Sequence, residues 1–487
     1  MYLKSNLNQT VVPLSILNQE WTYRGEGNAN LVLSLPNLRK IVKIRKTEKP
    51  VTLVQFLTEW LFRYVLWTDK IDAYSERDLM FYSDLMVHLI GGSFVSPAVP
   101  VIITKKEIYD LSIILKSERP ECRKNKNIQF GRASLLPDYA FLPKEWDSAL
   151  TGPTLAIEIK PKQGWVPFYD RQCEKCPFCL NQYVKLKNGS IKNISGYCPL
   201  DLFSGSKTRM INALHCLLNN PQNNFRAFKD GICVYDECSP FENMYKVVKE
   251  IFQQNQTTKN SLDVFINMLC ELLLKPHCYN QKDFGNCDIT INNVEHSLLI
   301  KEDSKISTKC DFTHHDLPSF CVLERILALQ MIDLAGLKNN FLLYKYLNSK
   351  RTLDNWEYID KICKLISTNK PKCPKRILMD YERKFVEMIG KGDGECYFDE
   401  MDEIYLVPYI VASIANDCSL MVTMRKVKKE RQGIENIPED CIFDFGDNGQ
   451  FAVNFGIFDL YPKPLSVIQK HKTRNERRQS AYRQITS

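Results

Sequence analysis

The sequence lacks a long uninterrupted apolar stretch. Its longest apolar segment, 51–67, contains Glu59 and Arg63 and is shorter than the roughly 20 apolar residues that a membrane-spanning helix needs. We therefore interpret it as an amphipathic core helix and expect no membrane partner. Residues 1–20 also lack a charged start followed by a long apolar segment, so no signal peptide is expected. These absences predict a soluble intracellular protein, cytoplasmic, nuclear or both.

The chain has no strong charge imbalance. Its 65 Lys and Arg residues exceed its 57 Asp and Glu residues by 8, and part of that excess lies in 470–487, which we interpret as a basic flexible tail. A mildly basic surface fits nucleic acid, membrane or a small polyanion equally well. Aromatic residues are not interleaved with Lys and Arg in any segment, so no stable nucleic-acid partner is expected.

The length excludes a single hydrophobic core, because such cores stop growing at roughly 250–300 residues. No internal repeat is visible, and a monomer is expected. Alternating and apolar patterns predict a kinase-like α+β or α/β fold of two lobes: a smaller β-rich lobe over 1–142, and a larger mixed lobe over 143–469 that is helical at 240–405. Strands are expected at 20–24, 31–35, 40–46 and 154–160, and two last strands near 405–423 and 451–459. Helices are expected at 51–67, at 76–90 and after Ser206.

A glycine-containing hairpin near the start is the first candidate for chemistry. Gly25 and Gly27 let a backbone approach phosphates closely, and Lys43 with Arg45 follows one strand later. This arrangement resembles the phosphate-covering loop of kinases. A plain hairpin turn explains the glycines equally well.

The strand 154–160 carries the second candidate. Because side chains alternate along a strand, Glu158 and Lys160 share one face at its end, and Lys162 follows beyond Pro161. Two lysines crowded at a strand end indicate an anionic ligand. The alternative is a solvated edge strand.

The chain has 18 cysteines, and four of them follow the pattern C-x2-C-x2-C-x18-C. Since secretion is not expected, thiols or metal ligands are favoured over disulfides. The spacing predicts a structural zinc site, with free thiols as the alternative. The four residues are Cys173, Cys176, Cys179 and Cys198. A second, less regular group is interpreted as unliganded: Cys310, His314, His315 and Cys321.

Two aspartates near the end of the chain suit phosphoryl transfer. An apolar run delivers Asp459, with Lys463 four residues later, and a carboxylate at a strand end is a natural Mg²⁺ ligand. Asp417 interrupts another apolar run, and a buried carboxylate needs a partner or a role such as accepting a hydroxyl proton. The Asp-Phe-Gly triplet at 444–446 lacks an upstream catalytic-loop sequence, so we interpret it as a turn.

Eight segments, in this order, resemble the inositol-pentakisphosphate 2-kinase family: YRGEGNANLVL, SERP, LLPDYAFL, IEIKPKQGWVPF, YCPLDLFSGSKTRM, QNNFRAF, NDCSLM and FDLYPKPL. They span about 21–240 and 405–465. The resemblance implies a kinase that uses ATP and Mg²⁺ to phosphorylate the 2-hydroxyl of inositol 1,3,4,5,6-pentakisphosphate, making inositol hexakisphosphate. The cysteine pattern looks like the animal-type arrangement of the family.

The resemblance also implies roles for individual residues. Asp417 and Lys160 would act in catalysis, with Asp417 as the base, and Asp459 would bind Mg²⁺. The substrate phosphates would be bound by Arg45, Arg119, Lys160, Lys162, Lys185, Asn223 and Lys463. The nucleotide would be bound by Gly25, Glu26, Gly27, Asn30, Lys43, Asp138, Ala140, Glu158, Asn224 and Arg226. One departure is that Val467 and His471 stand where plant members carry further substrate contacts.

Two other functions compete with this hypothesis. A basic zinc-containing nucleic-acid-binding protein would use the cysteines and the tail, with affinity falling steeply as salt rises. A non-catalytic inositol phosphate sensor would need neither a base nor a metal ligand, so the presence of both Asp417 and Asp459 counts against it.

Overall fold

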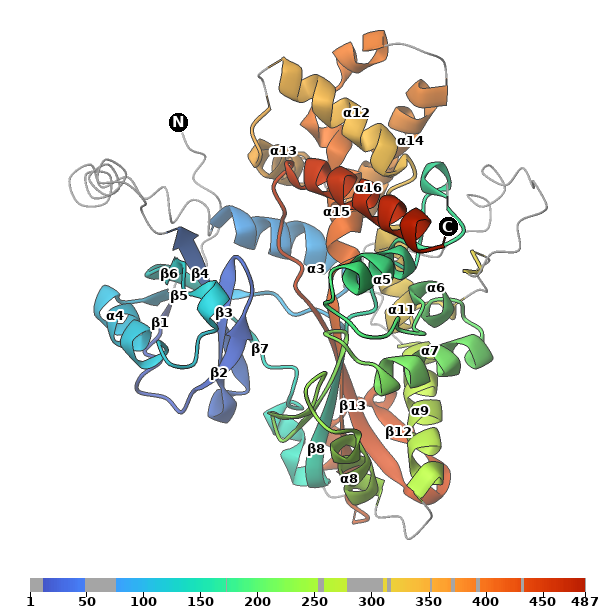
Figure 1. The fold of residues 1–487 in the computed structure, drawn as a ribbon. Coiled ribbons are helices and arrows are strands. Elements are labelled where there is room, and N and C mark those ends of the chain that lie inside the picture. Colours follow the sequence, from blue (N-terminus) through green and yellow to red (C-terminus); the bar gives the residue numbers. More distant parts are fainter. Residues whose placement is uncertain are drawn as a thin grey trace.

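The computed structural model contains two β-sheets, and most of its helices lie with the second sheet (Figure 1). It describes residues 12–48, 76–171, 173–252, 258–277, 310–312, 317–350, 353–368, 373–390, 395–430 and 433–486. The helix predicted at 51–67 and the residues His314 and His315 lie outside these ranges. Within the described residues, no helix combines the length and the apolar character needed to cross a membrane.

The first sheet belongs to the N-terminal part and has the order β1-β5-β7-β4-β3-β2, with β6 paired to β4. Its strands are β1 (Val12–Pro13), β2 (Thr22–Glu26), β3 (Asn30–Leu35), β4 (Lys40–Glu48), β5 (Val99–Ile103), β6 (Lys126–Ile128) and β7 (Gly131–Pro137). The three strands predicted around the glycines are therefore confirmed. Leu31 and Leu33 of β3 pack with Ile108 and Leu111 of helix α4 (Lys105–Ile114). Together these residues belong to a small hydrophobic core that is separate from the main one.

The second sheet has the order β10-β9-β8-β11-β13-β12, and all its described neighbours are antiparallel. Its strands are β8 (Leu150–Ile159), β9 (Phe225–Lys229), β10 (Ile232–Tyr235), β11 (Ser419–Val427), β12 (Ile442–Asp444) and β13 (Gln450–Phe458). The strand predicted at 154–160 is confirmed as part of β8. It lies between β9 and β11, so the alternative of a solvated edge strand is wrong.

The alternation along β8 explains its central place. Leu155, Ile157 and Ile159 are completely buried in the large core that the helices of the C-terminal part cover. Those helices include α7 (Lys207–Asn219), α8 (Phe241–Phe252), α9 (Thr258–Leu274), α11 (Val322–Gln330), α12 (Gly336–Ser349), α13 (Glu357–Thr368) and α14 (Pro374–Gly390). The helix predicted after Ser206 and the helical character of 240–405 are thus confirmed in the described residues.

One predicted strand is half wrong. Within 405–423 the structure forms helix α15 (Val407–Ala415) first, and strand β11 only begins at Ser419. All nine residues of α15 are buried, so the run has no polar face that could reveal a helical period. Pro408 stands in the first helical turn, where its missing N–H needs no partner.

The basic tail is also corrected. Residues 467–486 form helix α16 (Val467–Thr486), which packs on helices α5 (Pro177–Lys187) and α12 (Figure 1). Ile468 and Ala481 are buried in this packing, and the ring of Tyr482 meets the ring of Tyr183 edge-on at 4.9 Å. A few apolar contacts along a mostly charged helix are sufficient to order it, because its long Lys and Arg stems cover apolar surface.

The two sheets are joined by residues 138–149, which run from the end of β7 to the start of β8. The predicted division at 142/143 falls in this segment. Leu142 and Trp146 pack with Val427 of β11, so the second half of the segment belongs to the C-terminal part. The Asp-Phe-Gly triplet runs from the end of β12 into a 3-10 turn (Gly446–Asn448) before β13, as the turn interpretation predicts.

Candidate active site

The predicted base, lysines and metal ligand meet at one edge of the second sheet. Because β11 runs antiparallel to both neighbours, its first residues lie beside the last residues of β8 and β13: Leu420 pairs with Ile159 and Ser419 pairs with Phe458. Residues just before β11 and just after β8 and β13 are therefore brought together. These include Asp417, Lys160, Lys162, Asp459 and Lys463.

Asp417 lies between two lysines. Its carboxylate accepts a hydrogen bond from Lys162 Nζ at 3.1 Å and lies 3.7 Å from Lys463 Nζ. Enclosure by neighbouring elements would by itself raise the pKa of Asp417, but the ammonium groups of Lys463 and Lys162 hold it below its ordinary value. The carboxylate is thus ionised at neutral pH, as a proton acceptor must be.

The environment of Asp417 differs from the buried one that its apolar neighbours predict. The residue sits in the turn between α15 and β11, and 63% of its side chain is exposed. Lys463 is the more enclosed partner: it donates to Ser413 O at 2.8 Å, and burial lowers its pKa while Asp417 raises it. The apolar run therefore ends at Asp417 without burying it, so its carboxylate remains accessible.

Gln330 of α11 positions the Lys162 segment, and no sequence motif marks it. Lys162 has a left-handed backbone, with φ of 63°, which is unfavourable for a residue with a side chain. The buried Gln330 amide donates to Lys162 O at 2.9 Å and accepts from Gly164 N at 2.7 Å. A Cβ at Gly164 would lie 2.1 Å from the Phe203 ring, so this tight passage requires glycine. Only the long-range contact to α11 reveals this role.

Asp459 and Lys43 connect the two sheets. Asp459 follows β13, has φ of 66° and is half exposed, and its Oδ1 lies 3.4 Å from Lys43 Nζ of β4. The same ammonium lies 3.9 Å from the centre of the Tyr461 ring. A shallow cavity beside it has a lining of Asn30, Lys43, Arg45, Asp78, Arg132, Ala133, Ser134 and Tyr461. A carboxylate and a lysine thus face each other across the two sheets, as a metal–phosphate site requires.

Lys185 and its neighbours lie along β8, β9 and α5. Lys185 Nζ donates to Gln222 Oε1 at 2.7 Å, and burial together with nearby Lys162 lowers its pKa. Asn223 is exposed. Lys160 is held through its backbone N–H, which donates to Asn224 O at 2.9 Å.

Glu158 has two polar neighbours on the same side of the sheet. Ser419 Oγ donates to Glu158 Oε1 at 3.1 Å, and Arg226 lies 3.9 Å from Oε2. Asn224 is only 3% exposed, and its buried Oδ1 accepts no hydrogen bond within the described structure. Glu158, Arg226 and Asn224 are therefore brought together, but Asn224 is largely covered.

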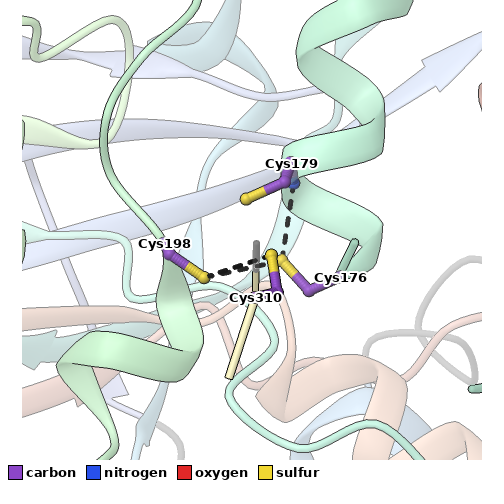
Figure 2. A group of neighbouring side chains, drawn as sticks. All are labelled: Cys176, Cys179, Cys198 and Cys310. Carbon is purple, nitrogen blue, oxygen red and sulfur yellow. Dashed lines mark hydrogen bonds between the residues drawn. The ribbon is translucent and has the colours of Figure 1, made fainter. Parts of the chain in front are cut away.

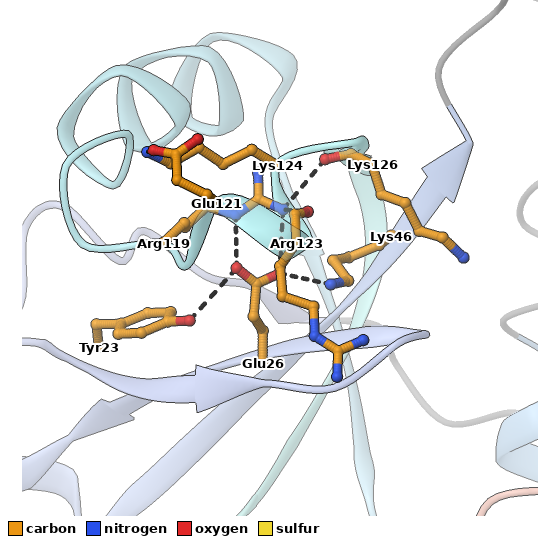
Figure 3. Close-up of polar contacts among 8 residues, drawn as sticks. All are labelled: Tyr23, Glu26, Lys46, Arg119, Glu121, Arg123, Lys124 and Lys126. Carbon is orange, nitrogen blue, oxygen red and sulfur yellow. Dashed lines mark hydrogen bonds and ion pairs between the residues drawn. The ribbon is translucent and has the colours of Figure 1, made fainter. Parts of the chain in front are cut away.

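Glu26 and Arg119, both predicted as ligand-binding residues, form an ion pair with each other (Figure 3). The Arg119 guanidinium donates to the two Glu26 carboxylate oxygens at 2.8 and 3.0 Å, and Lys46 Nζ contacts the carboxylate at 2.5 Å. The side chain of Glu26 is completely buried. Burial would raise the pKa of Glu26, but hydrogen bonds from Arg119 and Lys46 hold it below the ordinary value. The carboxylate of Glu26 is therefore enclosed in the N-terminal part, where Lys46 and Arg119 neutralise it.

Arg45 is likewise engaged. It forms an ion pair with Asp78, which lies in the helical segment at 76–90. Burial raises the pKa of Asp78 to about 6, although Arg45 acts to lower it. Substrate phosphate would therefore have to compete with Asp78 for this guanidinium.

The glycine hairpin is open towards the outside. Gly25 has φ of 142°, and a Cβ at Gly25 or Gly27 would meet nothing within 4 Å. Gly27 N donates to Asn30 O at 2.9 Å, which closes the turn. The backbone here is accessible to a ligand.

The segment after β7 adds an apolar patch beside the hairpin. Ala140 packs with Ala156, Phe228 and Met421, and its N–H donates to the Asp138 side chain at 3.1 Å. All four residues are buried, and the partly buried side chains of Tyr139, Phe141 and Phe458 pack against them.

His471 of α16 lies near Lys463, and its ring is already hydrogen-bonded. Its Nδ1 is 2.8 Å from Tyr409 OH. Burial, followed by the positive charges of Lys463 and Arg474, lowers the pKa of His471 to about 3. The imidazole is therefore neutral in this arrangement.

Four thiols gather beside α5, and one of them differs from the prediction (Figure 2). The sulfur atoms of Cys176, Cys179, Cys198 and Cys310 all lie within 4.8 Å of one another. Cys173 is not in this group, and Cys310, which was interpreted as unliganded, takes its place. Spacing alone favoured Cys173, because only the fold brings Cys310 across 112 residues to Cys198.

The sulfur–sulfur distances among these four cysteines fit a bound zinc ion. Four sulfurs at about 2.3 Å from a tetrahedral zinc lie about 3.8 Å apart. Cys198 Sγ lies 3.9 Å from Cys176 Sγ and 3.8 Å from Cys310 Sγ. Cys179 N donates to Cys176 Sγ at 3.5 Å, an orienting contact that also stabilises a thiolate.

Comparison with known proteins gives one consistent family. A family model described as Inositol-pentakisphosphate 2-kinase matches residues 23–478. An inositol-pentakisphosphate 2-kinase from Danio rerio is 27% identical, over 92% of this chain and 90% of its own length. Proteins of the same name from Drosophila melanogaster and Arabidopsis thaliana are each 29% identical, over 45% and 44% of this chain and 49% and 52% of their own lengths.

Proposed function

Since the chain belongs to the inositol-pentakisphosphate 2-kinase family, we propose that it transfers the terminal phosphate of ATP to the 2-hydroxyl of inositol 1,3,4,5,6-pentakisphosphate. The product is inositol hexakisphosphate. The observation that carries this proposal is the position of Asp417: an ionised, accessible carboxylate between Lys162 and Lys463, at the sheet edge that also holds Asp459.

The charge of the site suits the substrate. Each phosphate carries roughly −1.5 to −2 at neutral pH, so a pentakisphosphate carries about −8 to −10. Lys160, Lys162, Lys185 and Lys463 lie around Asp417 or along the neighbouring strand, and Asn223 is exposed next to them. These residues bind and orient the phosphates, and such positioning and charge neutralisation are most of what phosphoryl transfer requires.

Within this proposal Asp417 is the base that accepts the proton of the attacking hydroxyl. Lys43 and the open backbone at Gly25 and Gly27 bind the phosphates of ATP, and the patch at Ala140 accepts the adenine. Asp459 would hold Mg²⁺, which neutralises the charge on the transferred phosphate when bound. Glu158 and Arg226 lie on the nucleotide side of β8.

The four-thiol group would hold a structural zinc ion. Two of its cysteines lie at the start of α5, which carries Lys185, and Cys198 directly precedes α6 (Pro199–Leu202). A closed set of four sulfur ligands is typical of a structural site, because a catalytic zinc keeps one position open. The zinc would thus fix the helix from which one substrate lysine extends.

Product analysis tests the proposal. Purified protein is incubated with Mg²⁺-ATP and a panel of inositol phosphates, and the products are separated by anion-exchange chromatography. We expect conversion of the pentakisphosphate to the hexakisphosphate, and an Asp417→Asn variant that still binds the substrate but turns over about 10²–10⁴-fold more slowly. Absence of product with the unmodified chain, or unchanged turnover by Asp417→Asn, would contradict it.

The competing functions are not favoured by the family. A nucleic-acid-binding role would rest on the basic tail, but residues 467–486 form a helix packed against α5 and α12. A sensor would leave the pairing of Asp417 with two lysines without a purpose. Binding of the pentakisphosphate without any turnover would favour the sensor.

A further inference from the structure

Arg24, the second residue of the segment YRGEGNANLVL, stands at an irregular position of the glycine hairpin. In the pairing of β2 with β3, Tyr23 faces Leu33 and Gly25 faces Val32, so Arg24 is the additional residue of a β-bulge. A bulge re-aims a side chain and increases the local twist of its strand. Arg24 therefore leaves the regular register directly next to the glycine whose backbone is open to a ligand.

The Arg24 guanidinium contacts three different parts of the molecule. It forms an ion pair with Asp138 at 2.5 Å, at the start of the segment that joins the two sheets. It donates to the carbonyl of Gly231, in the turn between β9 and β10 of the second sheet. Its central carbon also lies 5.4 Å from the centre of the Phe228 ring. One side chain thus connects the hairpin, the joining segment and the second sheet.

The residues that Arg24 contacts are themselves held by other neighbours. Asp138 is 5% exposed and also accepts a hydrogen bond from Ser34 Oγ of β3. Gly231 has φ of 79°, and a Cβ there would lie 2.3 Å from the Phe141 ring, so the turn fits only as glycine. Phe228 belongs to the apolar patch that contains Ala140. The partners of Arg24 are therefore themselves held by neighbouring residues of the joining segment and the second sheet.

The far side of Gly25 is anchored too, because Glu26 is held by Lys46 and Arg119 (Figure 3). The two anchors differ in what they join. Glu26 is tied to residues of the N-terminal part alone, whereas Arg24 reaches the second sheet. Among these contacts, those of Arg24 join the hairpin to the apolar patch and the second sheet.

We propose that Arg24 is a positioning residue that fastens the glycine hairpin to Asp138 and the β9–β10 turn, and so determines how tightly the nucleotide is held. This inference rests on the proposed function, because it assumes that the hairpin covers ATP. Arg24 acts through the hairpin backbone. The inositol phosphate lysines lie on other elements, and their affinity for substrate does not depend on it.

Arg39 provides a matched control. Like Arg24 it belongs to the N-terminal part, and the two side chains are 20% and 21% exposed. It donates to Leu142 O at 2.6 Å and pairs with Asp147 at 2.5 Å, so it also crosses between the two parts of the chain. It does not contact the glycine hairpin or the Phe228 patch in the described structure.

The experiment measures Mg²⁺-ATP binding by titration calorimetry, without inositol phosphate, and then steady-state kinetics. Charged hydrogen bonds of this kind are each worth enough to change an equilibrium about tenfold. We expect Arg24→Gln to raise the Kd and the KM for ATP by about tenfold or more, while the KM for the pentakisphosphate stays within about twofold. Arg39→Gln should leave the ATP affinity unchanged even where it lowers the melting temperature.

Arg24→Lys separates charge from geometry. A lysine cannot reach the carboxylate and the carbonyl with a planar fork, so its ATP affinity should lie between those of the unmodified chain and Arg24→Gln. If Arg24→Gln does not fold, Arg24→Lys carries the test alone. Equal ATP affinity in the unmodified chain and the Arg24 variants would overturn the inference, as would an equal loss in Arg39→Gln. Failure of the unmodified chain to bind Mg²⁺-ATP would instead contradict the proposed function.

Discussion

The cluster of four cysteines contains Cys310 in place of the predicted Cys173, and this difference leads to a sharp prediction. Replacing Cys310 with Ser should remove one of four zinc ligands, whereas replacing Cys173 with Ser should not affect the metal. Both residues are cysteines close to the same helix, but only Cys310 has its sulfur within 4.8 Å of the other three. The pair of variants therefore distinguishes the folded arrangement from the sequence spacing.

The magnitude follows from the length of the loop that the metal closes. Cys198 and Cys310 are 112 residues apart, and a cross-link over a loop of that length lowers the entropy of the unfolded chain by an amount worth about 5 kcal/mol. Loss of the Cys310 ligand should thus reduce the free energy of unfolding by up to about 5 kcal/mol. Cys173 lies outside the group and is only partly buried, so its substitution should change the free energy by about 0.5 kcal/mol or less.

Two measurements check this prediction. Elemental analysis gives the zinc content per chain, and denaturant unfolding with and without a strong chelator gives the stability that the metal contributes. The unmodified chain and Cys173→Ser should carry zinc and lose stability with chelator. Cys310→Ser should carry less zinc and be insensitive to chelator. Full zinc content in Cys310→Ser, or loss of zinc in Cys173→Ser, would refute the assignment of Cys310 as the fourth ligand.

Three further predictions concern buried charge and the C-terminal helix. Burial raises the pKa of Asp78 from 3.8 to about 6 in the folded chain. The unmodified protein should therefore lose up to about 3 kcal/mol of stability relative to Asp78→Asn as the pH rises from about 4 to about 6. Denaturant unfolding at several pH values measures this loss, and parallel pH profiles of the two proteins would contradict it. Glu26→Gln should cost about 3–5 kcal/mol by leaving Lys46 and Arg119 without their buried counter-ion, and a loss of ATP affinity without a loss of stability would show that Glu26 binds nucleotide after all. Ala481→Glu should lower the unfolding free energy by about 1–3 kcal/mol, because Ala481 is 4% exposed in the packing of α16; an unchanged free energy would mean that the helix does not contribute to the core.

Elements with a clear period were predictable from the sequence. The β2–β3 hairpin was predicted from its glycines and flanking apolar residues, β8 from the alternation of Leu155, Ile157 and Ile159, and α7 from apolar residues at helical spacing. Helix α15 was missed because every one of its residues is buried, so no polar residue marks a face. Helix α16 was missed for the opposite reason, since its few buried residues are hidden among charges.

The site was predictable to the extent that it follows strand ends. Asp417 and Asp459 flank strands that were visible as apolar runs, and antiparallel pairing brings them together. Contacts across long separations could not be predicted in this way. Cys310, Gln330 and Arg24 each act on a segment more than 100 residues away, and nothing in their local sequence indicates the partner.

Asp417 keeps the ammonium groups of Lys162 and Lys463 together at the sheet edge. An accessible carboxylate among several lysines holds the positive charges close to one another, and without it Lys162 and Lys463 would repel each other. A substrate that carries about −8 to −10 attracts both lysines far more strongly than one carboxylate does. Under the proposed function, the substrate phosphates would compete with Asp417 for the ammonium groups of Lys162 and Lys463, which would weaken the charge effect that lowers the pKa of Asp417. Asp417 would then be a stronger proton acceptor in the substrate complex than in the free protein, which is the state in which the proposed reaction needs a base.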